Sequence, residues 1–335
     1  MLTFFVCFAL DRFTAGGNQL RGPVPPQFGF MPFLEVVWLN DNALSGEIPG
    51  ELAGAQNLEV FDVAANRLSG FIPTSIAELP NLSDLILSDN FLSGQIPTEM
   101  RSMTELVRFH AENNWLSGFI PSLDFAEGLE ELRVGNNYFG AQPFPEFIMA
   151  LPALRDLRLN NCTLTGQFPW EIGNITELVR LDLHDNLLWG QIPFSIASHQ
   201  GLRELRLQDN QLSGFFPIEI TFLSELERLS LSNNFIDGVL PEAMGSLTSL
   251  VSLFLEDNSF DGSLPVSIGE LESIEVMDFR NNNFTGSLPE TIVNCGSLSK
   301  SLRQLFRSAL ENAYNNDSTS HISNYDHFRG TGTRR

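Results

Sequence analysis

Leucine-type residues recur along this chain at fixed distances from asparagine, and this spacing organises almost the whole sequence. Leu34, Val37 and Leu39, for example, stand eight, five and three positions before Asn42. Glycine follows four positions after the asparagine, proline seven, and another apolar residue ten. The step is 24 residues between the regular neighbours among these asparagines: Asn18, Asn42, Asn66, Asn90, Asn114, Asn186, Asn210, Asn234, Asn258 and Asn282.

Two irregular units lie between Asn114 and Asn186. Asn137 occupies the asparagine position after a step of 23, and Cys162 occupies it after a step of 25. Because the two irregularities cancel, the frame returns in register. The pattern therefore predicts about twelve units of the form LxxLxLxxNxLSGxIPxxI.

Each repeated position has a structural role. The LxL segment alternates with a period of two, which predicts a short strand with its leucines turned inward. One such strand cannot bury itself, but stacked coils form a parallel sheet over one continuous core. The asparagine amide can donate to and accept from the backbone of adjacent coils, whereas Cys162 offers only a weak donor. The predicted fold is an α/β-type repeat solenoid, a horseshoe or superhelix with a concave parallel sheet.

The tract after each asparagine points to a family. LSGEIP (44–49), LSGFIP (68–73), LSGQIP (92–97) and LSGFIP (116–121) resemble the plant-type leucine-rich repeat, over residues 10–298. That family is found in ectodomains of receptor-like kinases, in receptor-like proteins and in secreted inhibitors of wall-degrading enzymes. The resemblance implies a non-catalytic module for extracellular recognition of a peptide, glycan or protein, with a co-receptor as a further partner. The paired-cysteine caps common in such ectodomains and the kinase signatures are missing from this sequence.

The composition of the chain argues against several classes of partner and site. The chain has 41 acids against 19 bases, a formal charge of −22, and its one lysine is Lys300. Such a protein repels phosphate backbones, so we do not expect nucleic-acid binding. Cys7, Cys162 and Cys295 share neither a disulfide framework nor metal-ligand spacing. No apolar run approaches the ~20 residues that span a bilayer.

The strand positions between the inward leucines face the concave side, and arginine gathers there. From the fifth to the tenth unit each strand carries one, in the rows four or six residues before the asparagine: Arg108, Arg133, Arg158, Arg180, Arg206 and Arg228. Acids accompany them, including Glu131, Asp156, Asp182 and Glu204. One interpretation is a recognition strip for carboxylates or sulfates, with bidentate guanidinium contacts. The other is a ladder of exposed ion pairs, each contributing about 0–1 kcal/mol.

Apolar and histidine side chains complete the candidate surface. Trp38, with Val36, Val60 and Ile86, is expected on the N-terminal side of the arginines and Phe254 on the C-terminal side; an exposed Trp38 would anchor a ligand, unless another segment covers it. His110 and His184 lie near carboxylates, Glu112 and the Asp182/Asp185 pair. A flat surface does not bring together the three or four groups of a metal site. No nucleophile elbow or oxyanion loop supports catalysis, so we expect neither an enzyme nor a cofactor.

Sequons and the chain ends give further expectations. Acceptor sequences for N-glycosylation occur at Asn81, Asn161, Asn174, Asn283 and Asn316. We expect residues 1–9 to be a partial first repeat or a secretory signal, and 10–298 to be the repeat domain. Helical spacing at 299–314 predicts a helix that caps the last coil, and 315–335 reads as a disordered tail.

Two hypotheses remain from the sequence. The first is a cell-surface or secreted binding module that uses the concave strip; replacing Arg133, Arg158 and Arg206 by alanine is then expected to abolish binding with little change in melting temperature. The second is a cytoplasmic scaffold for protein–protein interaction, without glycans.

Overall fold

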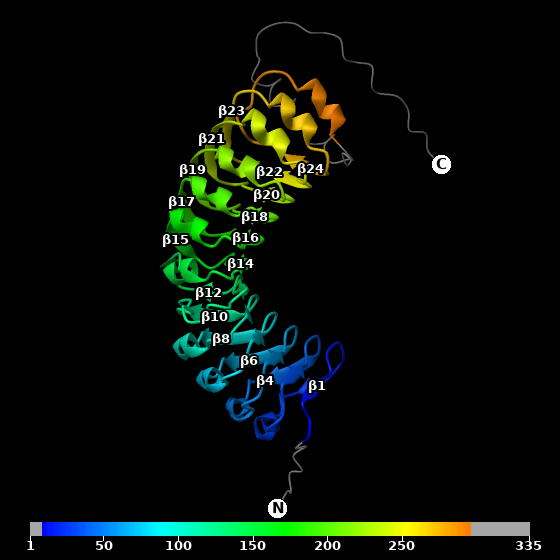
Figure 1. Cartoon of the computed structure of the whole chain (residues 1–335), viewed down its shortest axis with the longest axis vertical. Coiled ribbons are helices and arrows are strands. Elements are labelled where there is room, and N and C mark those ends of the chain that lie inside the picture. Colours follow the sequence, from blue (N-terminus) through cyan, green and yellow to red (C-terminus); the bar gives the residue numbers. More distant parts are fainter. Residues whose placement is uncertain (1–8, 296–335) are drawn as a thin grey trace, which may run out of the picture.

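The computed structural model describes residues 9–295, and the predicted cap (299–314), the tail (315–335), Asn316 and residues 1–8 lie outside that part. The described chain winds into a curved superhelix (Figure 1). Its concave side is a parallel sheet of twelve strands, in chain order. The strands are β1 (Arg12–Thr14), β3 (Val36–Trp38), β5 (Val60–Asp62), β7 (Asp84–Ile86), β9 (Arg108–His110), β11 (Glu131–Arg133), β14 (Asp156–Arg158), β16 (Arg180–Asp182), β18 (Glu204–Arg206), β20 (Arg228–Ser230), β22 (Ser252–Phe254) and β24 (Val276–Asp278).

The concave strands confirm the predicted alternation. The middle residue of each strand points into the core, and Leu157, Leu181 and Leu205 have no exposed surface. The first and third residues point out, and each pairs with the same position of the next strand, as Asp156 does with Arg180. Because a parallel sheet with one buried face is fixed in register by its apolar residues, the outward residues form continuous rows.

The glycine-containing tracts form a second set of strands on the lateral side of the coil, which was not predicted from the sequence. These strands make two six-stranded parallel sheets, which we call the lateral sheets. The first contains β2 (Arg21–Gly22), β4 (Ala43–Gly46), β6 (Arg67–Phe71), β8 (Phe91–Gln95), β10 (Trp115–Gly118) and β12 (Tyr138–Phe139). The second contains β13 (Gln142–Pro143), β15 (Leu164–Gln167), β17 (Leu187–Gly190), β19 (Gln211–Phe215), β21 (Phe235–Val239) and β23 (Ser259–Asp261). The break falls in the irregular unit that follows Asn137.

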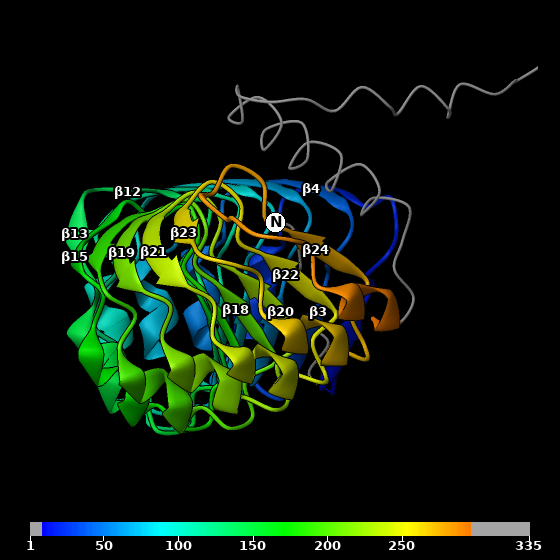
Figure 2. The same ribbon diagram turned by 90° about the horizontal axis from the view of Figure 1, so that it is seen from above.

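The convex side is made of short 3₁₀ helices, each preceded by a proline. Proline suits this place because its fixed φ leads into a helix and its missing N–H needs no partner there. The helices are η1 (Pro26–Phe30), η2 (Gly50–Gly54), η3 (Thr74–Glu78), η4 (Thr98–Ser102), η5 (Glu146–Ala150), η6 (Trp170–Asn174), η7 (Phe194–Ser198), η8 (Ile218–Phe222), η9 (Glu242–Ser246), η10 (Val266–Glu270) and η11 (Glu290–Asn294). Figure 2 shows concave strands, lateral strands and 3₁₀ helices on different sides of the coil.

The asparagines form the expected ladder. Asn66 accepts from the Leu44 N–H at 2.9 Å and donates to the carbonyls of Leu39 and Val63 at 2.9 and 3.0 Å. These bonds join neighbouring coils and satisfy buried backbone groups. Cys162 offers only its thiol, with Sγ 3.6 Å from the Val134 carbonyl oxygen, so the ladder is weakest in its unit, as expected.

Candidate functional site

The concave face carries two parallel rows of outward side chains. The first residue of each concave strand forms what we call the upstream row, and the third residue forms the downstream row. The register places Arg108, Glu131 and Asp156 side by side in the upstream row. Neighbouring side chains of one row are separated by the strand spacing, about 4.8 Å. Long side chains in these rows can therefore reach one strand to either side.

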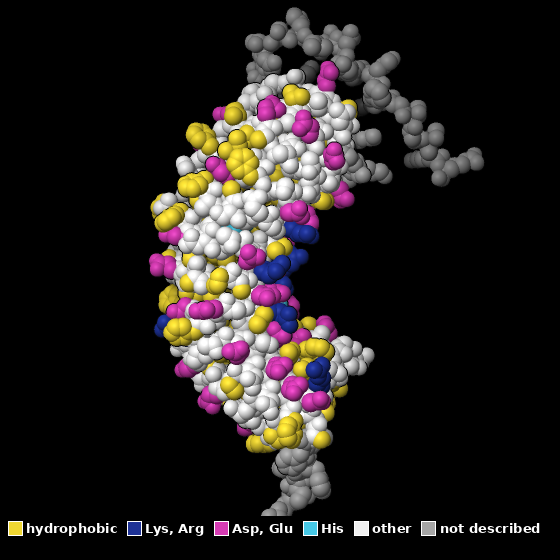
Figure 3. Space-filling view, in the orientation of Figure 1, with side chains coloured by type: hydrophobic (Ala, Val, Ile, Leu, Met, Phe, Trp, Pro, Cys, Tyr) yellow, Lys and Arg dark blue, Asp and Glu magenta, His cyan; other side chains and the backbone are white. Residues whose placement is uncertain are grey.

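The six predicted arginines lie together on six successive strands, β9 to β20. We call them the arginine strip: Arg108, Arg133, Arg158, Arg180, Arg206 and Arg228. In Figure 3 the basic side chains gather along the concave edge at mid-length, with acidic side chains beside them. Five carboxylates share the two rows of β7 to β20: Asp84, Glu131, Asp156, Asp182 and Glu204. This region is therefore slightly positive in a chain whose net charge is −22.

Asp156 is the centre of the strip. Its carboxylate accepts from Arg133 Nη2 at 2.8 Å and from Arg158 Nε at 2.9 Å, and Arg180 Nη1 lies 3.5 Å away. Burial alone would raise the pKa of Asp156, but the hydrogen bond and charge of Arg158, with the charges of Arg133 and Arg180, hold it below its ordinary value. The group is therefore ionised at neutral pH and fixes three guanidiniums.

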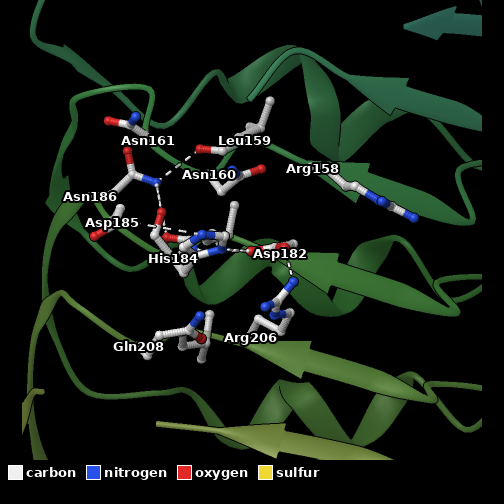
Figure 4. Close-up of polar contacts among 12 residues, drawn as sticks. Arg158, Leu159, Asn160, Asn161, Asp182, His184, Asp185, Asn186, Arg206 and Gln208 are labelled. Atoms are coloured by element: carbon white, nitrogen blue, oxygen red, sulfur yellow. Dashed lines mark hydrogen bonds and ion pairs between the residues drawn. The ribbon is translucent and has the colours of Figure 1, made fainter. Parts of the chain in front are cut away.

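A second cluster lies on the next two strands, β16 and β18. Arg206 Nη1 donates to Asp182 Oδ2 at 3.2 Å, and the other oxygen of Asp182 contacts His184 Nδ1. Figure 4 shows this chain of contacts, with Asn186 donating to the Leu159 carbonyl of the preceding coil beside it. The histidine is thus held by a carboxylate and does not point into an open site.

Arg228 is the least constrained of the six arginines. Its nearest carboxylate is Glu204, with an Nη1–Oε1 distance of 3.7 Å. Arg180 is also loosely held, at 3.5 Å from Asp156 and 3.6 Å from Glu204. These two guanidiniums are therefore free to reorient toward a bound group at little cost.

The acids and the arginines differ in exposure. Asp156 and Asp182 side chains are 5% and 9% exposed, whereas Arg180 and Arg228 are 46% and 49% exposed. A short carboxylate stays close to the sheet, and a long guanidinium extends over it. The ion-pair ladder is present, and it also holds the outer surfaces of the arginines toward solvent.

The N-terminal end of the strip contains one histidine, His110, with Glu131 and Glu112 nearby. His110 contacts Glu131, at 2.9 Å, and Glu112 contacts neither of them by a hydrogen bond. Burial and the charge of Arg133 lower the pKa of His110, so the ring is neutral at pH 7. Burial raises the pKa of Glu112 to about 7, against the charges of Arg133 and Arg158. Glu112 is therefore expected to take up a proton at a higher pH than an ordinary glutamate.

The apolar candidates divide into exposed and covered ones. Trp38 is 44% exposed, so no part of the described chain covers it. Phe254, Val60 and Ile86 are half-buried. Val36, expected to be exposed, is only 5% exposed even though it stands in the upstream row. Trp38 therefore remains a candidate anchor on this side, whereas Val36 is buried within the upstream row and offers a ligand little surface.

Four glycosylation candidates are exposed in the structure: Asn81, Asn161, Asn174 and Asn283. Asn174 ends η6, so it stands on the convex side, away from the arginine strip. The amide of Asn81 donates to the Gln56 carbonyl of the preceding coil. A glycan at Asn174 would leave the concave face open.

Other chemistry has little support in the described residues. Between residues 9 and 295 no three His, Cys, Asp or Glu side chains are placed to hold a metal ion. Burial raises the pKa of the Cys162 thiol, which keeps it protonated and unreactive. In the same part of the chain no helix has the length and apolarity to cross a bilayer.

Comparisons with known proteins agree with this architecture. Family models described as leucine-rich repeats match residues 200–260 and, separately, 57–79, 81–103, 153–175 and 273–295. No curated protein matches the sequence.

Solved structures with the same fold include receptor ectodomains of plants. The plant peptide hormone receptor RGFR1 in complex with RGF2 is 32% identical, with a TM-score of 0.80, over 87% of this chain and 51% of that one. A TDR receptor is 31% identical, with a TM-score of 0.80, over 84% and 49%. The Arabidopsis receptor kinase HAESA, in complex with the peptide hormone IDA and the co-receptor SERK1, is 32% identical, with a TM-score of 0.75, over 87% and 53%.

The present chain thus spans about half the length of the receptor chains it resembles. The repeat pattern, the concave sheet with its asparagine ladder, the family models and these structures agree. The chain is a leucine-rich-repeat protein of the plant type.

Proposed function

We propose that this chain is a non-catalytic recognition module that binds an extended, acidic peptide along the concave face at the cell surface. The observation that carries the proposal is the exposed arginine strip: six arginines on successive strands, four of which are held within 3.2 Å by the buried carboxylates of Asp84, Asp156 and Asp182. Guanidinium pre-organised in this way loses little side-chain entropy when a carboxylate binds. This also explains the use of arginine, since lysine cannot make the two-pronged contact.

Similar proteins support the ligand class. RGFR1 was solved with RGF2, and HAESA with a peptide hormone and a co-receptor, and both share this fold at about one-third identity. Trp38 would receive an apolar side chain of the ligand near the N-terminal end. The anionic groups of the ligand would then lie over β16 to β20, where Arg180 and Arg228 are both exposed and loosely paired.

The contacts of Asp156 make the alanine variant at Arg133, Arg158 and Arg206 a poor test of this proposal. Alanine at Arg133 and Arg158 would leave the buried Asp156 with Arg180 at 3.5 Å as its one remaining arginine. Removing the partners of a buried charge costs about 3 kcal/mol or more. From these contacts we expect the triple variant to melt at a lower temperature than the wild type, so a loss of binding in it would be ambiguous.

Arg180→Gln with Arg228→Gln is the better variant. Asp156 keeps its two close arginines, and the fold is expected to melt as the wild type does. Peptides are first selected on the wild-type chain from a random displayed library, and their Kd is then measured by calorimetry. Each lost charge-assisted contact is expected to weaken binding by about tenfold.

The matched control removes two equally exposed arginines elsewhere. Arg203 is 54% exposed just before β18, and Arg21 is exposed on the lateral strand β2. Arg203→Gln with Arg21→Gln changes the net charge equally, and its Kd should stay within about twofold. Equal loss in both variants, or no loss in either, would refute the concave strip as the binding site.

A further inference from the structure

The first lateral sheet exposes a group of large aromatic side chains. We call it the lateral aromatic patch: Phe71, Phe91, Trp115, Phe119 and Tyr138, which are 66%, 41%, 53%, 63% and 70% exposed. Four of them lie on β6, β8, β10 and β12, on the side opposite the buried Leu68, Leu92 and Leu116, and Phe119 directly follows β10. Singly exposed aromatics are ordinary, but a contiguous group of them marks a binding surface.

Register makes the patch continuous. Phe71 pairs with Ser93, and Ser93 pairs with Trp115, so these three lie on one line across the strands. Ser117 lies between Gln95 and Tyr138 in the same way. The rings of Phe91 and Trp115 are 5.2 Å apart. The rings therefore form a row that runs across the strands, along the axis of the solenoid.

Hydroxyl and amide groups are interleaved with the rings. The hydroxyls of Ser93 and Ser117 donate to backbone carbonyls at 3.2 Å, which leaves their oxygens available as acceptors. Two residues before Trp115 and Tyr138, the amides of Asn113 and Asn136 stand exposed in a ladder, with Asn136 Nδ2 2.8 Å from Asn113 Oδ1. Each amide group retains hydrogen-bonding capacity for a ligand.

Charge is nearly absent from this surface. The strands β8, β10 and β12 contain no charged residue. Glu47 and Arg67 stand at the N-terminal edge of the patch, and the exposed Asp89, just before β8, accepts from the Asn113 amide at the start of the ladder. A protein partner would normally meet a charged or polar rim around an apolar centre. An uncharged partner rich in hydroxyl groups would meet no repulsion from a chain of charge −22.

We propose that the lateral aromatic patch binds a neutral polysaccharide chain lying along the solenoid axis. The C–H face of a pyranose ring is attracted to the electron-rich face of an aromatic ring. Its equatorial hydroxyls would hydrogen-bond with the amide ladder and the serine oxygens. An extended chain of such rings would meet an aromatic side chain on successive strands, as the register provides.

The second lateral sheet supplies a contrast within the molecule. It also exposes aromatics, including Trp189, Phe215 and Phe235. There, however, Asp237 pairs with Phe215, and Asp261 pairs with Val239. These carboxylates stand on the strands themselves, whereas β8, β10 and β12 of the lateral aromatic patch contain no charged residue. Phe235, which is 62% exposed at the same repeat position as Trp115, is thus a matched control.

The test titrates the full chain with cellohexaose, mannohexaose, xylohexaose and, as an acidic probe, hexagalacturonate, by calorimetry and tryptophan fluorescence. At least one neutral hexasaccharide is expected to bind, and Trp115→Ala to weaken it by about tenfold or more. Trp115→Phe should retain binding within about threefold, and Phe235→Ala within about twofold. The Arg180→Gln/Arg228→Gln variant should bind the sugar normally, which separates this proposal from the concave one.

Several outcomes would overturn the proposal. These are no binding of any neutral probe, an equal loss in the Phe235→Ala control, or binding of hexagalacturonate alone. Sedimentation velocity tests the other class of partner. Self-association that Trp115→Ala abolishes, without sugar binding, would make the patch a protein interface.

Discussion

His199 is the residue whose replacement most directly tests the description of the core. It follows η7 at the position that Ile175 and Leu223 occupy in the neighbouring coils, and it has no exposed surface. Neither ring nitrogen has a partner in hydrogen-bonding geometry, although the Ile175 backbone is near enough to favour the charged form slightly. Burial lowers the pKa of His199 to about 4, from an ordinary value of 6.5.

The sign of the pH effect follows from this pKa. The unfolded chain takes up a proton near pH 6.5, whereas the folded chain resists it until about pH 4. Stability is therefore full above pH 6.5 and is lost as the pH falls toward 4. At about 1.4 kcal/mol per pH unit the loss is about 2 kcal/mol at pH 5 and about 3 kcal/mol once both states are protonated.

Urea unfolding of the wild type and His199→Leu, followed by far-UV circular dichroism between pH 4 and pH 8, measures this effect. Leucine fills the same position without a buried polar atom, so the variant should be more stable by about 1 kcal/mol at pH 8. Its advantage should grow as the pH falls. Ile175→Leu repacks the adjacent coil and should shift stability equally at every pH. A constant difference between His199→Leu and the wild type across this range would refute the reasoning.

Three further changes test separate features. Asn210→Ala removes the acceptor for the Leu188 N–H, at 3.1 Å, along with three donated bonds. Urea unfolding should show that the free energy of unfolding falls by about 3 kcal/mol, and a fall below about 1 kcal/mol would contradict the stabilising role of the asparagine ladder. Gly94→Ala should lower stability by about 1–2 kcal/mol, because φ is +75° there and the new Cβ would meet the Phe71 ring. The double variant Gly94→Ala/Phe71→Ala should regain part of this lost stability in scanning calorimetry, because the contact with the ring is removed. Cys162 should resist iodoacetamide at pH 8 in the folded chain and react in urea, as mass spectrometry would detect; rapid labelling of the native protein would show that the thiol is not buried.

The regular part of the fold follows from the sequence because each repeated position has one physical solution. Leu157, Leu181 and Leu205 each stand five residues before the asparagine position of their unit. Their strands are too short to bury an apolar face alone, so the coils must stack. The asparagine of each unit is equally predictable, because its amide can both donate to and accept from the backbone of adjacent coils. The arginine strip could also be predicted, since alternation alone assigns Arg158 and Arg206 to the outward rows.

Other features depend on contacts between coils that spacing does not specify. The lateral sheet arises from register between tracts such as β6 and β8, although the buried Leu68 beside the outward Ser69 is a signal in the sequence. Alternation also places Asp156 and Arg180 in one row, and cannot show that the short side chain is covered while the long one is exposed. For the same reason Val36 was expected at the surface, and the contact between His110 and Glu131 could not be specified from the sequence.

The central claim is that the arginine strip faces solvent and meets the ligand. Arginine footprinting with phenylglyoxal, read by mass spectrometry, tests it directly on the wild-type chain with and without a selected acidic peptide. We expect Arg180 and Arg228 to be modified readily in the free chain and protected in the complex, while Arg203 and Arg21 react equally in both. Protection confined to Arg203 or Arg21, or no modification of Arg180 and Arg228 in the free chain, would contradict the account.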